Sequence, residues 1–196
     1  MNLQTLQITN RSTDEYALLI FLHGVGANER AMLSLAEAAP QRCGSIAVRA
    51  PVALGPDSYA WFQVNFTEAG PIIDECQARL SLESLAELIR SVKAKHHNLP
   101  IFAVGFSQGA IMALLLSLTL PELIHGAICF SGRFPPEFGQ DIAAGPLSAE
   151  TRIWVGHGVE DRVLPIHYGR RIQTLLETYS VPHRYQEFAA RHEVSQ

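Results

Sequence analysis

The sequence is poor in cysteine, and the cysteines it has are scattered. Only Cys43, Cys76 and Cys129 occur among 196 residues, and no two of them form a C-x-x-C pair. An odd and widely spaced set of this kind predicts free thiols in a reducing compartment, and it argues against a disulfide framework or a zinc site. We therefore expect a cytoplasmic protein without a bound metal ion.

Long basic runs and long apolar runs are also missing. No run of lysine and arginine exceeds a pair, and the net charge is −4, which argues against nucleic acid or an anionic membrane as the main partner. The longest strictly apolar run, 110–116, has seven residues, whereas a membrane span needs about 20. The N-terminus lacks the basic start and apolar core of a signal peptide. These absences exclude nucleic-acid binding and integral membrane association as leading interpretations.

Apolar segments of two lengths alternate along the chain and predict an α/β fold. Runs of strand length suggest strands at 3–9, 16–22, 45–49, 101–104, 127–130, 152–155 and 183–188, the first of them opening a hairpin. Helical patterns lie at 28–39, 74–97, 107–120 and 165–179. Short links between the two kinds of segment favour one mostly parallel, doubly wound sheet over residues 1–196. The segment 52–71 reads as a long irregular loop of the kind that often carries function.

A G-x-S-x-G motif is the most informative short pattern. Gly105-Phe106-Ser107-Gln108-Gly109 follows the predicted strand 101–104 and opens the apolar helix 107–120, which is the setting of a nucleophile elbow. Glycines allow the sharp turn, and the helix N-terminus favours negative charge beside the serine. The alternative is a serine that merely caps a helix after a glycine turn.

A serine hydroxyl needs a base, and the base needs an acid that orients it. In the fold that uses this elbow, the acid and then the histidine follow the serine along the chain. Asp161 follows the predicted strand 152–155, with Glu160 as the second choice and Asp141 a poorer fit. Of eight histidines, only His192 follows both the acid and the last strand. His23 and His157 are expected to orient loops.

Ester chemistry also needs hydrogen-bond donors for the oxyanion of the tetrahedral intermediate. The backbone N–H of Gln108 is one candidate, and the glycine turn His23-Gly24-Val25-Gly26 after an early strand offers another. A phosphate cradle is a poorer interpretation of this turn, because no G-x-G-x-x-G or G-K-[S/T] pattern follows it.

Several motifs at this combined spacing resemble the phospholipase/carboxylesterase family, which includes acyl-protein thioesterases and small bacterial carboxylesterases. The likeness runs from about Leu18 to Ser195 and rests on Leu22 to Gly26, Trp61-Phe62, Gly105 to Gly109, His157-Gly158 with Asp161, and His192. The resemblance implies a single α/β-hydrolase domain without a large cap. It also implies a triad of Ser107, Asp161 and His192, oxyanion donors at Val25 and Gln108, and no cofactor.

Two further expectations concern the substrate side and the end of the chain. Trp61 and Phe62 are candidates for the wall of the acyl pocket, and His23 and Gly24 are expected to lie beside the substrate. The alternative role of the two aromatic residues is to hold the long loop against the core. Only residues 193–196 follow His192 in this sequence, so we expect the closing helix usual in the family to be absent. A partner subunit is one way to cover that face, which leaves a homodimer as a candidate assembly.

The sequence thus predicts a serine hydrolase that cleaves carboxylic esters of small or single-chain substrates through an acyl-enzyme. One alternative is an acyl-protein thioesterase or lysophospholipase that prefers long acyl chains, so the substrate is expected to be a small ester or a thioester. The other is a hydrolase-like binding module that has lost catalysis.

Overall fold

The computed structural model describes residues 3–8, 15–67, 70–96, 99–142 and 151–194. Its centre is a seven-stranded sheet in the order β1-β3-β2-β8-β9-β10-β11. Every neighbouring pair is parallel except β1, which runs antiparallel to β3. The strands are β1 (Thr5–Ile8), β2 (Ala17–Leu22), β3 (Cys43–Val48), β8 (Ile101–Phe106), β9 (Gly126–Phe130), β10 (Arg152–Gly158) and β11 (His183–Phe188).

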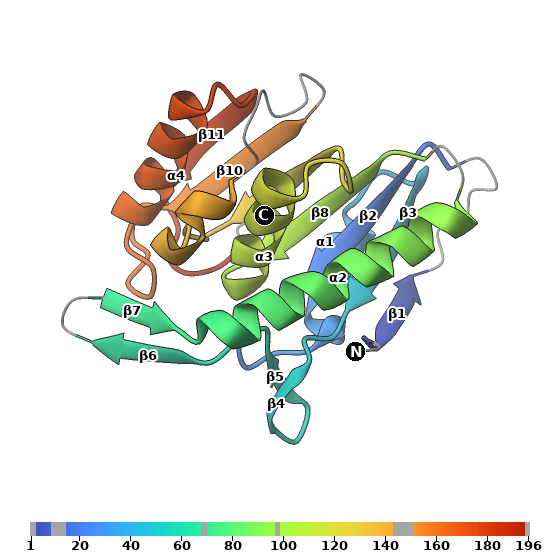
Figure 1. Ribbon diagram of the computed structural model, residues 1–196, viewed down its shortest axis with the longest axis horizontal. Coiled ribbons are helices and arrows are strands. Elements are labelled where there is room, and N and C mark those ends of the chain that lie inside the picture. Colours follow the sequence, from blue (N-terminus) through green and yellow to red (C-terminus); the bar gives the residue numbers. More distant parts are fainter. Residues whose placement is uncertain (1–2, 9–14, 68–69, 97–98, 143–150, 195–196) are drawn as a thin grey trace.

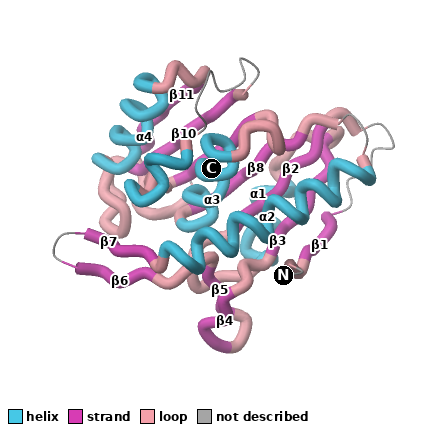
Figure 2. The backbone as a smooth tube through the Cα atoms, viewed as in Figure 1, coloured by secondary structure: helices cyan, strands magenta, loops and turns pink. Residues whose placement is uncertain are grey.

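Helices cover the two faces of this sheet unequally. In Figure 1, α2 (Glu75–Lys95), α3 (Gln108–Thr119) and α4 (His167–Thr178) lie in front of the sheet, and the short α1 (Leu33–Glu37) lies behind it. The tube view in Figure 2 shows the same layers. The 3₁₀ helix η1 (Glu29–Met32) leads into α1 and packs with it on a smaller second core. The structure therefore has the three-layer architecture that the alternation of segments predicts.

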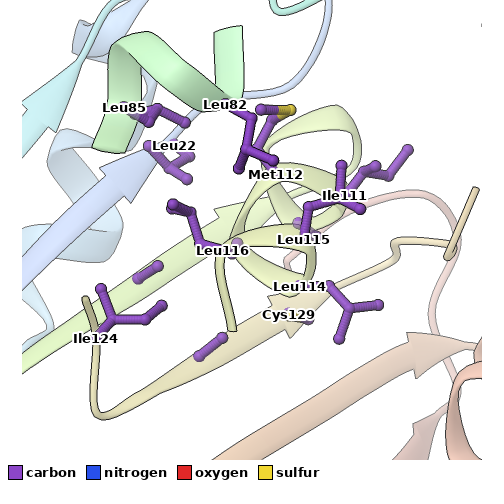
Figure 3. Packing of buried hydrophobic residues seen from close by; sticks show 14 of the residues in the cluster. Leu22, Leu82, Leu85, Ile111, Met112, Leu114, Leu115, Leu116, Ile124 and Cys129 are labelled. Carbon is purple, nitrogen blue, oxygen red and sulfur yellow. The ribbon is translucent and has the colours of Figure 1, made fainter. Parts of the chain in front are cut away.

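Burial on all sides explains the composition of α3. Eleven of its twelve residues are buried, because the helix is enclosed between α2 and the sheet. Figure 3 shows Met112, Leu115 and Leu116 of α3 near Leu82 of α2 and Leu22 of β2. An apolar helix in such a position has no solvent face to keep polar, and its N-terminus is fixed against the end of β8.

Two expectations from the sequence are corrected. Residues 3–9 do not open a hairpin, because β1 pairs with β3 rather than with the next strand. The segment 52–71 is not irregular: it forms one hairpin of β4 (Val52–Gly55) with β5 (Ser58–Ala60), and β6 (Val64–Thr67) then pairs with β7 (Gly70–Ile73). A 3₁₀ helix, η2 (Pro136–Asp141), lies between β9 and β10.

Within the described ranges, no helix is both long enough and apolar enough to cross a bilayer.

Candidate active site

Ser107 occupies a strained turn between β8 and α3. Its backbone has φ 53° and ψ −116°, a conformation that costs a residue other than glycine free energy and often marks functional sites. Its N–H donates to the carbonyl of Phe130 at 2.9 Å, which ties the turn to β9. A Cβ on Gly105 would lie 2.3 Å from the carbonyl oxygen of Gly109, so the strand and the helix meet too closely for any other residue there.

The side chains of Ser107, His192 and Asp161 form one continuous chain of hydrogen bonds. His192 Nε2 lies 2.9 Å from Ser107 Oγ, and His192 Nδ1 lies 2.7 Å from Asp161 Oδ2. Because an ionised carboxylate only accepts, Nδ1 carries the proton and Nε2 is left to accept from the hydroxyl. These residues stand 85 and 31 positions apart in the chain, so the fold alone brings them together.

The Asp161 carboxylate is fully buried and amply hydrogen-bonded. Oδ1 accepts the backbone N–H groups of Val163 and Leu164 at 2.9 and 2.8 Å, and its side chain has no solvent exposure. His157 Nε2 lies 3.5 Å from Oδ2 and 2.7 Å from the Leu164 carbonyl. Burial lowers the pKa of His157, so this ring remains neutral and orients the acid loop without adding a charge.

The two other acids considered from the sequence lie elsewhere. Asp141 Oδ2 bonds Arg79 Nη2 at 2.8 Å, far along the chain on α2. Glu160 is exposed in the turn before Asp161. Neither carboxylate has a hydrogen bond to His192 among the contacts of the described residues.

The loop that carries His192 rests directly on the end of β10. A Cβ on Gly158 would lie 2.4 Å from the carbonyl oxygens of Ala190 and Arg191, so a glycine is needed for this approach. Glu160 N–H donates to the Ala190 carbonyl at 3.0 Å. The His192 ring also packs against Phe106, with 4.9 Å between centroids. These contacts hold the imidazole in place.

The glycine turn after β2 is held from two sides. His23 Nδ1–H donates to the Gly24 carbonyl at 2.7 Å, and Nε2 accepts the N–H of Ala50 at 3.0 Å. This pattern requires the neutral ring, and burial lowers the pKa of His23 in agreement. Gly26 takes a φ of 81°, and its N–H donates to the backbone carbonyl of Tyr59 at 2.8 Å.

This turn leaves donors free beside the nucleophile. Among the described residues, the N–H of Val25 has no backbone acceptor, and Gln108 is the first residue of α3, where an N–H has no acceptor within the helix. A Cβ on Gly24 would lie 3.3 Å from Ser107 Cβ, so the turn approaches the serine closely. Two donors near Ser107 Oγ are what a tetrahedral oxyanion needs.

The side chain of Gln108 has a structural role that the sequence did not reveal. Its Oε1 accepts the N–H of Trp61 and its Nε2 donates to the carbonyl of Phe62, both at 2.7 Å. The Trp61 indole N–H donates to the His23 carbonyl at 2.9 Å. Gln108 and Trp61 therefore join the nucleophile turn to the glycine turn. The sequence feature that could have indicated this role is the polar residue Gln108 directly after the predicted nucleophile.

One cavity is lined in part by Ser107, and a second is lined in part by His192. The smaller cavity has a volume of about 40 Å³. The residues that line it include Phe62, Ser107, Gln108 and Arg133. The larger cavity is a groove with a volume of about 530 Å³, and it runs from His192 and Phe106 along η1 and α1. Trp61 is fully buried behind the smaller cavity rather than in its wall.

No group of three or more potential metal ligands gathers among the described residues. All three cysteines are free thiols, and burial raises the pKa of Cys129 to about 12.

Comparison with known proteins agrees with this architecture. A family model described as Phospholipase/Carboxylesterase matches residues 3–196. Acyl-protein thioesterase 1 of Mycosarcoma maydis is 29% identical, over 89% of this chain and 82% of that protein. Acyl-protein thioesterase 1 of Saccharomyces cerevisiae is 31% identical, over 77% of this chain and 73% of its own length.

Solved structures share the fold at low sequence identity. The structure of esterase PE8 superposes with a TM-score of 0.84 at 24% identity, covering all of this chain and 94% of its own. The carboxylesterase of Bacillus cereus gives a TM-score of 0.82 at 21% identity, with coverage of 98% and 88%. The structure of acyl-protein thioesterase 2 of Zea mays gives a TM-score of 0.83 at 22% sequence identity, covering 98% of this chain and 92% of its own.

Proposed function

Because the chain belongs to the phospholipase/carboxylesterase family, it is a serine hydrolase of esters, and we propose that Ser107, His192 and Asp161 are its catalytic triad. The observation that carries the proposal is the hydrogen-bonded chain from Ser107 Oγ through the imidazole to the buried carboxylate. Such an arrangement activates a hydroxyl that is otherwise a weak nucleophile at neutral pH. No metal or organic cofactor is needed for this chemistry.

The reaction proceeds by acyl transfer to the serine. Ser107 Oγ attacks the ester carbonyl carbon as His192 Nε2 takes the hydroxyl proton, and the N–H groups of Val25 and Gln108 stabilise the oxyanion. The intermediate then expels the alcohol, which receives that proton from His192. Water, deprotonated by the same imidazole, attacks the acyl-enzyme, and the carboxylic acid is released as His192 returns that proton to Ser107 Oγ. Asp161 stabilises the imidazolium at each stage.

The two cavities suggest which part of the substrate lies where. His192 must reach the leaving oxygen to protonate it, so the groove beside His192 suits the alcohol or thiol. The small cavity bordered by Ser107 and Gln108 then receives the acyl chain. This assignment favours small acyl groups on a larger alcohol. All these groups come from one chain, so the mechanism operates in a monomer or in the homodimer considered above.

Fluorophosphonate labelling tests the nucleophile directly. The wild-type protein is expected to form one stable adduct, seen as a mass increase, and Ser107→Ala is expected to lose it. Ser117→Ala is a matched control, because Ser117 is a buried serine of α3 whose hydroxyl donates to the Ala113 carbonyl. A wild-type protein that folds but is not labelled would favour the inactive binding module. Labelling that persists in Ser107→Ala would place the nucleophile elsewhere.

A second candidate function is supported by the larger groove. Its volume and its apolar wall, which includes Ala31, Met32 and Leu35, could accommodate a long acyl chain, as in a thioesterase or lysophospholipase. A series of nitrophenyl esters from acetate to palmitate separates the two. We expect kcat/KM to fall once the acyl chain exceeds about four carbons, because the small cavity is then full. A steady rise toward palmitate would instead place the acyl chain in the groove.

A further inference from the structure

Arg133 is a buried cation with few hydrogen-bond partners among the described residues. It follows β9, its exposed fraction is 4%, and its Nη2 donates to the carbonyl of Pro71 at 3.1 Å. No other hydrogen bond and no ion pair of this guanidinium exists among the contacts of the described residues. A guanidinium carries five N–H donors. Most of its hydrogen-bonding capacity is therefore unused.

Such an arrangement is costly unless something compensates it. Taking a charge out of water without a partner carries a desolvation penalty, and burial lowers the pKa of Arg133 for this reason. Glu137 and Tyr168 act in the opposite direction through space, but neither has a hydrogen bond or ion pair with Arg133 among the contacts of the described residues. The contact with Pro71, 62 residues away, fixes the guanidinium in place without neutralising it.

The guanidinium lines the same small cavity as the nucleophile. Ser107 and Gln108 contribute to one part of the wall, and the remaining side chains are mostly apolar, namely Val25, Phe62, Val64, Pro71, Ile73, Ile111, Val163 and Leu164. A cavity of about 40 Å³ takes roughly three or four water-sized groups, at about 10–15 Å³ for each. The cavity therefore has room for a few atoms between apolar side chains, and its lining contains one fixed cation.

We propose that this cavity binds the acyl part of a half-ester of a short dicarboxylic acid, with the free carboxylate held by Arg133. Planar guanidinium and carboxylate groups match in a bidentate pair, and the methylene groups of the acid lie against the apolar wall. The inference rests on the proposed function, because it places the acyl group beside Ser107. It adds a substrate class to that function: esters whose acyl end is anionic.

Monomethyl succinate and methyl 4-methylpentanoate make a matched pair of substrates, because a branched CH(CH₃)₂ group replaces the carboxylate at nearly the same size. Methanol release gives kcat/KM for both. The wild-type protein is expected to favour the half-ester by about 10- to 100-fold, as a hydrogen-bonded charge pair would. Arg133→Met is expected to lose this preference, and Arg133→Lys to retain part of it. Arg171→Met, at an exposed arginine of α4, removes the same charge and is expected to keep the preference.

Binding of free succinate keeps this inference separate from the proposed function. Calorimetry on Ser107→Ala is expected to detect succinate, and Ser107→Ala/Arg133→Met is expected not to bind it. If the neutral ester is cleaved but the half-ester is not preferred and succinate does not bind, the anion subsite is wrong and the triad stands. If neither ester is cleaved and labelling fails, the triad is wrong, and succinate binding then decides the subsite alone. Should Arg133→Met not fold, the wild-type preference and Arg133→Lys still decide.

Discussion

Replacing His192 by alanine is expected to lower kcat for an activated ester by a factor on the order of 10⁴ to 10⁶. Without the imidazole, Ser107 keeps its proton during attack, and no base remains to deprotonate the water that cleaves the acyl-enzyme. The double variant Ser107→Ala/His192→Ala is expected to be no slower than either single variant, because the two groups act as one unit. Stopped-flow or end-point assays with nitrophenyl acetate measure both.

Asp161→Asn separates the roles of charge and geometry within the same prediction. An amide that accepts from Val163 and Leu164 through oxygen presents its NH₂ to His192 Nδ1 and so favours the ring with hydrogen on Nε2, which cannot accept from Ser107. A loss of about 10⁴-fold in kcat is expected. Asp141→Asn is the matched control, since that carboxylate bonds Arg79 away from the serine. Activity of Asp161→Asn within tenfold of the wild type would contradict the assignment.

The fold class and the proposed triad could be predicted because both depend on local patterns and chain order. The run Tyr16–Leu22 reads as a strand buried on both faces, and all six residues of β2 are indeed buried. The motif at Ser107 joins a strand to a helix within five residues. For Asp161 and His192, the carboxyl ends of parallel strands meet at one edge of the sheet, so order along the chain was enough to choose candidates that the structure brings together.

The segment between β3 and α2 could not be predicted in the same way. Its strands have three or four residues each, too few for alternation to show. The environments of Trp61 and Phe62 were also undetermined by sequence. Both are fully buried, but only Phe62 lines the cavity, and this difference depends on tertiary packing rather than on a local pattern.

Arg133 escaped prediction for a different reason. It stands in a glycine- and proline-rich stretch with no periodic pattern, and its hydrogen bond to Pro71 crosses 62 residues of the chain. Burial of a charged side chain depends on tertiary packing and leaves no mark in the local sequence. The chemistry of the substrate side is therefore encoded mainly by long-range contacts, whereas the chemistry of bond cleavage is encoded by motifs.

Gly109→Ala is expected to destabilise the protein more than any single change in the triad. A Cβ at this position would lie 1.9 Å from the Leu22 carbonyl oxygen and 2.7 Å from that of His23. Both atoms belong to backbone at the end of β2, in the centre of the sheet, so neither can move without displacing the strand. Gly109 also lies in the first turn of α3, which is buried almost throughout. The helix would have to shift away from β2 and lose its packing.

The expected loss exceeds about 4 kcal/mol in the free energy of unfolding, which is large for one methyl group and comparable to the whole stability of many domains. Urea unfolding followed by circular dichroism measures it, and the yield of folded protein gives a first indication. Gly139→Ala is the matched control, since nothing lies within 4 Å of its Cβ position, and a change within about 0.5 kcal/mol is expected there. If Gly109→Ala were as stable as the control, α3 and β2 could not approach each other as closely as described, and the position of the Ser107 turn against the glycine turn would have to be revised with it.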